Sequence, residues 1–117
     1  MKVSRSQLKV LGENQQGVFE QKMIAHLRQH LARDGQPVDA AEARAAVRAG
    51  MRRALHHGIR IEYDVGRFID LWWVLGPGFD EQPPWAAILA APHAPRLRVD
   101  QLCRTALQRL GGALREG

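Results

Sequence analysis

Several residue types are scarce in this chain of 117 residues, and each shortage argues against a class of protein. Its single cysteine, Cys103, has no partner for an internal disulfide, which argues against a disulfide-stabilised fold and suits a reducing compartment. No stretch reaches the roughly 18 apolar residues of a membrane span, and no apolar segment follows the polar N-terminal residues. We therefore expect a cytoplasmic protein with no signal peptide and no membrane partner.

The abundant residues favour a helical domain. Hydrophobic residues make up 45% of the chain and charged residues 25%, which is ordinary for a globular protein and argues against disorder. Alanine, leucine and arginine dominate, and all three are good helix formers. No stretch alternates apolar and polar residues over a full strand. The sequence therefore predicts an all-α fold, with residues 1–117 in a single domain.

Turn-forming residues divide the chain into five predicted helices. Asp39 is a candidate N-cap, with Glu42 three residues later as its capping-box partner. Gly58 stands where a residue in the left-handed conformation commonly ends a helix. A Gly-Pro-Gly run at 76–78 ends the most hydrophobic segment. The helices are predicted at residues 6–33, 40–57, 62–75, 85–91 and 95–114, joined by short connections.

Trp72 and Trp73 stand side by side in the third predicted helix. Adjacent helical residues point about 100° apart, so one side of the helix cannot bury both rings. Because Trp72 is in register with Phe68 and Leu75, it is predicted to lie in the core. Trp73 then points toward the surface or the edge of a groove, where it could anchor a partner. The alternative is that the third helix is packed on all sides and buries Trp73 as well on a wide apolar face.

The segments after the third helix are predicted to close the core. Phe79 and Trp85 are expected to fold back onto the third helix, while Asp80 caps the short fourth helix or binds loop amides. The last helix is expected to turn its apolar residues inward. These are Leu97, Leu102, Cys103, Ala106, Leu107, Leu110 and Leu114.

Residues capable of chemistry are present, but their spacing matches no known type of site. His26 and His30 lie four residues apart on one predicted helix, yet zinc needs three or four ligands and no further ligand has suitable spacing. His56 and His57 suit a helix C-terminus, where positive charge is favourable. Cys103 is predicted to be a buried structural residue. We therefore expect no catalytic residues, no bound metal, no cofactor and no small-molecule ligand.

Positive charge is concentrated in the first half of the chain. Residues 1–60 hold 11 Lys and Arg against 5 Asp and Glu, whereas residues 61–117 hold 6 against 7. Arg44, Arg48 and Arg52 form a basic line on the second predicted helix. Such a line could follow phosphates, but aromatic residues for base stacking are not interleaved with it. A face for an acidic protein or a solvated surface explains it better.

Most of the sequence resembles a family of small helical proteins encoded beside type VI secretion effectors, adaptors and spike-tip proteins in Gram-negative bacteria. The residues that carry the resemblance are GMRRA (50–54), HGI (57–59), YDVGRFIDL (63–71), LGPGFD (75–80), PWA (84–86), IL (88–89) and residues 98–110. The segment 19–31 fits the N-terminal helix of that family. The resemblance implies a chaperone partner or co-chaperone that helps to load effectors.

The leading hypothesis is therefore a non-catalytic accessory factor that binds another protein, either an effector or its chaperone or adaptor. An immunity protein or antitoxin that binds a toxin directly is one alternative, and a basic nucleic-acid-binding module is another. Tryptophan and arginine are enriched at the energetic centres of protein interfaces. We accordingly predict that Trp73, with Arg48 and Arg52 nearby, forms part of the partner-binding surface.

Overall fold

The computed structural model describes residues 9–12, 15–32 and 35–116, and for residues 112–116 the backbone alone. Within these ranges the chain forms five α-helices and one short 3-10 helix, which confirms the all-α prediction. They are α1 (Gln16–His30), α2 (Ala40–His56), α3 (Glu62–Leu75), η3 (Phe79–Glu81), α4 (Trp85–Ala90) and α5 (Pro95–Glu116). The predicted bounds were right for α3 and within two residues for α2, α4 and α5.

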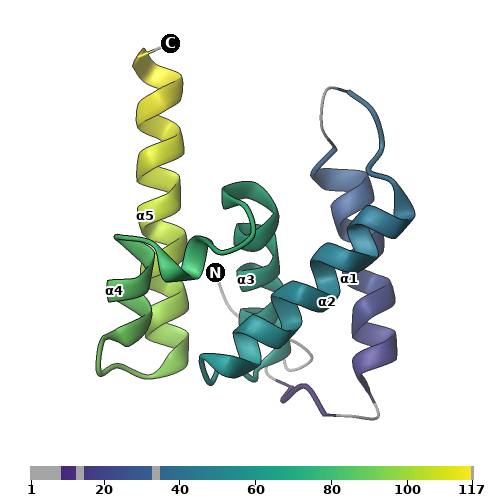
Figure 1. Ribbon diagram of the computed structural model, residues 1–117, viewed down its shortest axis with the longest axis horizontal. Helices are drawn as coiled ribbons and strands as arrows, with labels where there is room; N and C mark the ends of the chain where they lie inside the picture. Colours follow the sequence, from purple (N-terminus) through teal and green to yellow (C-terminus); the bar gives the residue numbers. More distant parts are fainter. Residues whose placement is uncertain (1–8, 13–14, 33–34, 117) are drawn as a thin grey trace.

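The central element is α3, which lies between the α1–α2 pair and the α4–α5 pair (Figure 1). Its side chains fill the core from both sides, and Val65, Phe68 and Ile69 are completely buried. α2 crosses α3 very closely at Gly50. A Cβ atom at Gly50 would stand 2.9 Å from Cγ1 of Ile69, so the crossing requires glycine there.

The first helix is shorter than predicted. It begins at Gln16, whereas residues 9–11 are extended and pair with the segment that leads into α3. The N–H of Leu11 donates to the carbonyl of Arg60, and the N–H of Glu62 donates to the carbonyl of Lys9, each at 2.7 Å. This pairing, which buries Leu11, competes with helix formation in the segment before Gly12. Residues 6–8, 13–14 and 33 of the predicted helix lie outside the described residues.

Both predicted end signals of α2 are confirmed. The Asp39 carboxylate accepts hydrogen bonds from the backbone N–H groups of Ala41 and Glu42 at 3.1 and 3.2 Å. Gly58 follows the helix with a φ of 77°, the left-handed conformation that glycine adopts without strain. These two signals are local, which explains why the sequence was sufficient to find them.

The predicted aromatic closure is confirmed for Phe79, which packs on α3, and Trp85 packs in turn on Phe79. The ring of Phe79 lies 5.3 Å from Phe68, 6.2 Å from Trp72 and 6.0 Å from Trp85, measured between centroids. Both alternatives predicted for Asp80 were wrong, because α4 has no side-chain cap and the Oδ1 atom of Asp80 has no hydrogen-bond partner in the described part of the chain. Its Oδ2 atom instead accepts a 2.7 Å hydrogen bond from Nε of Arg53 and lies 2.7 Å from Nε2 of His57. Asp80 thereby ties η3 to the end of α2.

Arg98 on α5 joins the ends of several elements. Its guanidinium donates to the backbone carbonyls of His57, Leu89 and His93 at 2.9, 2.9 and 3.1 Å. One side chain therefore satisfies the carbonyl that follows α2, one carbonyl in the last turn of α4 and one in the loop after α4. Carbonyls at helix ends lack partners within their own helices. This contact links three helices at one point.

Two predictions of side-chain placement were wrong. Trp73 is buried, because the C-terminal end of α1 covers it and the carbonyl of Leu31 accepts a 3.0 Å hydrogen bond from its indole N–H. α3 is packed on more than one side, so it buries both tryptophans. On α5, the expected inward stripe is only partly buried. Leu102 and Ala106 face the core, whereas Leu97, Leu107 and Leu110 are 57%, 71% and 44% exposed, and the side chain of Leu114 lies outside the described residues.

Candidate functional site

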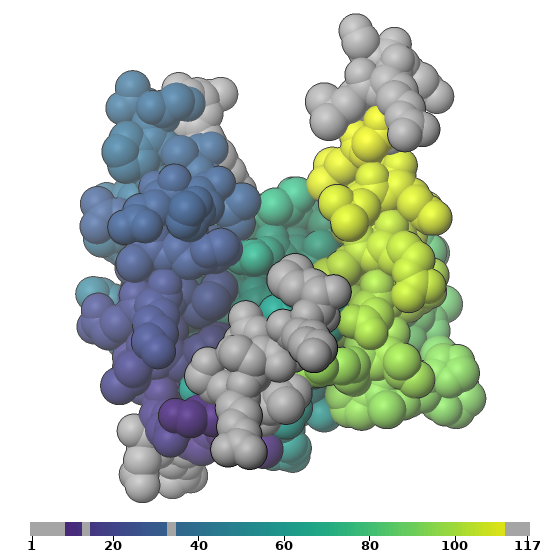
Figure 2. All heavy atoms as spheres, turned by 180° about the vertical axis from the view of Figure 1, so that it is seen from behind, coloured from purple at the N-terminus to yellow at the C-terminus, as the bar shows by residue number. Residues whose placement is uncertain are grey.

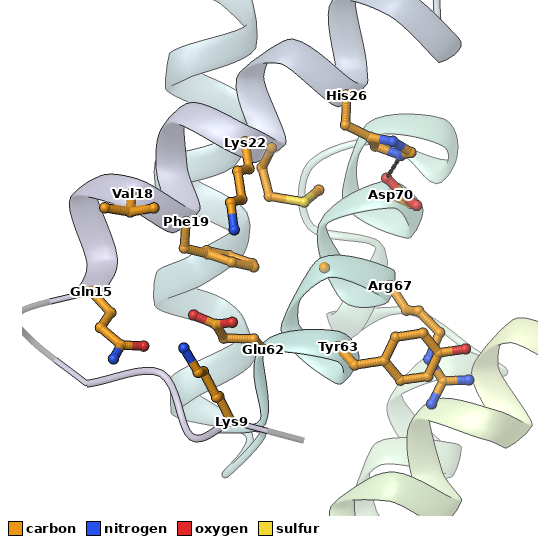
Figure 3. A pocket seen from close by; sticks show the side chains of 12 residues that line it. Lys9, Gln15, Val18, Phe19, Lys22, His26, Glu62, Tyr63, Arg67 and Asp70 are labelled. Carbon is orange, nitrogen blue, oxygen red and sulfur yellow. Dashed lines mark hydrogen bonds and ion pairs between the residues drawn. The ribbon is translucent and has the colours of Figure 1, made fainter. Parts of the chain in front are cut away.

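A cleft runs between α1 and α3 on the face of the molecule opposite to the view of Figure 1. Figure 2 shows this face, hollowed between α1 and α5, with α3 set deeper between them. The cleft has a volume of about 650 Å³. Its walls come from α1, α3 and the extended segment that precedes α1, as the close-up in Figure 3 shows.

The floor of the cleft is apolar. Phe19 and Met23 reach it from α1, and Gly66 faces them from α3. A Cβ atom at Gly66 would lie 3.4 Å from the sulfur of Met23 and 4.0 Å from Cζ of Phe19. The missing side chain at Gly66 therefore leaves space within the cleft, whereas the missing side chain at Gly50 allows two helices to touch.

Charged side chains stand around this floor. Lys22 extends from α1 over Phe19, and Lys9 and Glu62 stand at the end where both helices begin (Figure 3). At the other end, Nε2 of His26 lies 3.0 Å from Oδ1 of Asp70. Burial raises the pKa of Asp70, and the opposing influence of His26 does not cancel that effect.

A series of linked ion pairs connects the cleft to α5. Asp64 is buried and accepts from Nη2 of Arg67 at 2.8 Å and from Nε of Arg96 at 3.3 Å, while Arg67 also reaches Asp100 at 2.8 Å. The guanidinium groups of Arg67 and Arg96 lie 4.7 and 5.5 Å from the ring centroid of Tyr63. Burial alone would lower the pKa of Arg67, but its bonds to the two aspartates raise it. Arg67 is thus a fixed cation on the cleft wall.

The structure separates the three residues predicted to bind a partner. Arg48 and Arg52 are exposed on α2, and Nε of Arg48 lies 3.0 Å from Oε1 of Glu20 on α1. Trp73 is buried and hydrogen-bonded at the end of α1. The premise of an exposed tryptophan beside arginines is therefore wrong, although a role for Arg48 and Arg52 stays a prediction.

The other candidates from the sequence occupy structural positions. His57 is held by the buried carboxylate of Asp80, and hydrogen bonds from His57 and Arg53 lower the pKa of that carboxyl group although burial by itself would raise it. Cys103 is half-buried on α5, and burial raises the pKa of its thiol above the usual value. A raised thiol pKa reduces the fraction of reactive thiolate.

Comparison with known proteins found no match, whether among family models, curated proteins or solved structures. Over the described residues, no group of three or more His, Cys, Asp or Glu side chains is placed to hold a metal ion. None of the helices in the described ranges combines the length and apolar character that crossing a bilayer requires.

One polar feature of the cleft is a histidine–carboxylate pair at its end. His26 and Asp70 form a histidine–carboxylate pair, which in hydrolases activates a nucleophile. The residues that line this cleft, all within the described part of the chain, include no serine, threonine or cysteine. Sequence reasoning missed the cleft, although glycine at position 66 inside a hydrophobic helix was a usable indication of close approach.

Proposed function

We propose that this chain is a non-catalytic accessory factor that holds a segment of another protein in the cleft between α1 and α3. The observation that carries the proposal is the apolar floor around Gly66, surrounded by charged side chains. Protein interfaces have this composition, with an apolar centre that excludes water and a polar rim that remains hydrated.

The resemblance to proteins encoded beside type VI secretion effectors supports one class of partner. A factor that helps to load effectors must bind and release them without altering them covalently. An open cleft between two helices suits such reversible binding. We therefore propose an effector, or the chaperone or adaptor that accompanies it, as the partner.

Substitution of Gly66 tests this proposal directly. The residue lies within α3 and has no side chain of its own, so a new side chain there enters the cleft. Gly66→Met should fill the floor and abolish binding, whereas Gly66→Ala should leave most of the cleft open. Alanine also has a helix propensity about 1 kcal/mol better than glycine, which makes it a suitable control.

The measurement is co-expression of the tagged chain with a candidate effector from the same genome, followed by size-exclusion chromatography of the purified complex. We expect the wild type and Gly66→Ala to retain the effector and Gly66→Met to lose it at an unchanged melting temperature. Equal retention by all three proteins would show that the partner binds elsewhere. The exposed arginine line on α2 that includes Arg48 and Arg52 would then be the next surface to test.

A further inference from the structure

The charge that this chain leaves uncompensated is positive. Its carboxylates are mostly engaged within the chain: Glu20, Asp39, Asp64, Asp70, Asp80 and Asp100 each hold a hydrogen-bond or ion-pair partner. Lys9 and Lys22, by contrast, form no ion pair with any residue in the described ranges. Both lysines line the cleft. Of the two acids in its lining, Asp70 pairs with His26, whereas Glu62 forms no ion pair with a described residue. An acidic ligand would neutralise the excess.

The walls of the cleft define the shape of such a ligand. α1 and α3 run in the same direction there, because the start of α1 lies near Glu62 and His26 lies beside Asp70. Val18, Lys22 and His26 follow one another at four-residue spacing along one wall. At about 1.5 Å per residue, this wall extends for about 12 Å, or a little over two helical turns.

The backbone of the ligand is constrained as well. Backbone N–H and C=O groups along α1 and α3 are engaged within their own helices, so these walls offer no hydrogen bonds to an extended strand. A helical ligand satisfies its own backbone and needs to present only side chains. Binding of an amphipathic helix in a groove between helices follows the same logic.

The structure assigns the cleft to an acidic amphipathic helix of another protein, which packs its apolar side over Gly66 and directs carboxylates toward Lys22 and Lys9. This assignment rests on the proposed protein-binding function and specifies the chemistry of the bound segment. Lys22 lies beside the apolar floor, so one side chain can interact with both the acidic and the apolar parts of the ligand (Figure 3).

A pair of synthetic peptides of about 16 residues tests the assignment, since shorter helices are marginal in water. Both carry leucines at helical spacing, and one has glutamates where the other has lysines on the flanks. Fluorescence anisotropy with the full chain should give an affinity for the acidic peptide at least about tenfold above that for the basic one. The difference should shrink as salt is raised, because exposed charges are screened.

Charge reversal locates the interaction. Lys22→Glu should lower the affinity for the acidic peptide by about fivefold or more and raise the affinity for the basic peptide. This is the effect expected when an exposed ion pair is converted to a repulsive pair. Arg44→Glu makes the same change of charge at an exposed residue of α2, away from the cleft lining, and should leave the preference unchanged. In NMR spectra of the intact chain, the acidic peptide should shift amide signals of α1 and α3.

Three results would overturn the assignment: equal affinity for the two peptides, no binding of the acidic peptide at about 1 mM, or displacement of the acidic peptide by a short DNA duplex in a Lys22-dependent manner. None of these results depends on the effector experiment. If the effector is retained by the wild type and lost with Gly66→Met while the peptides show no charge preference, the protein-binding function stands and the acidic helix does not. If the peptides behave as expected but no effector is retained, the identity of the partner is wrong.

Discussion

Replacing Asp80 by asparagine should destabilise the protein more than the change of one atom suggests. The carboxylate has no exposed surface and holds both Arg53 and His57 at 2.7 Å. Removing one member of a buried charge pair costs about 3–5 kcal/mol. Arg53 is 29% exposed and also reaches Glu81 at 3.6 Å, so part of its charge stays compensated. We therefore expect the lower end of the range, about 3 kcal/mol, which corresponds to roughly 12 °C in melting temperature.

The pH dependence of this loss distinguishes a charged contact from simple packing. Because the folded pKa of Asp80 lies below its unfolded value of 3.8, its contribution to stability is fully present above pH 3.8. The contribution is lost as the pH falls through the folded pKa. Asparagine does not titrate, so the free energies of unfolding of wild type and Asp80→Asn should differ less at pH 3 than at pH 6.

Urea denaturation followed by circular dichroism, with linear extrapolation at both pH values, measures the difference. Glu81→Gln is the matched control, because Glu81 is 72% exposed and its contact with Arg53 is long. We expect this substitution to lower the free energy of unfolding by less than about 0.5 kcal/mol. The reasoning is refuted if Asp80→Asn costs under about 1 kcal/mol at pH 6. It is also refuted if the cost is the same at pH 3.

The remaining predictions concern packing and reactivity. Trp73→Ala should lower the free energy of unfolding by about 3–5 kcal/mol in denaturant titrations, and a near-neutral result would mean that the ring is not part of the core. Gly50→Ala should be destabilising because its Cβ would collide with Ile69, whereas Gly66→Ala should be neutral or stabilising; thermal melts that reverse this order would contradict the contact distances. Cys103 should react with a disulfide reagent at neutral pH at least about tenfold more slowly in the folded than in the urea-unfolded protein, and equal rates would argue against its burial.

Local patterns accounted for most of the fold. Asp39, Gly58 and the break at 76–78 act on neighbouring residues, so the helix ends could be predicted from single segments. The start of α1 could not be predicted in this way. Residues 9–11 are extended because they pair with residues 60–62, which are distant in sequence. The prediction for Trp73 was wrong for a similar reason, because its burial depends on the C-terminal end of α1 lying over α3.

The candidate site was less predictable than the fold. The pairing of His26 with Asp70 joins residues 44 positions apart, and no spacing rule relates them. The role of Asp80 was misjudged because a carboxylate beside a predicted helix suggests a cap, whereas tertiary packing brought Arg53 and His57 to it. The cleft itself depends on how α1 and α3 are both held by α2, which is a property of the assembled helices.

The hydrogen bonds of Arg98 determine which helix ends unfold locally together. Because its guanidinium holds the carbonyl after α2 and a carbonyl in the last turn of α4, neither helix end can separate from α5 without exposing several unpaired groups at once. The amide hydrogens of these three helix ends should therefore exchange with solvent in one concerted opening. The outer turns of α5, where Leu107 is exposed, carry no such constraint and should exchange separately by fraying. One arginine side chain thus sets the boundary between a cooperative unit and a helix end that opens alone.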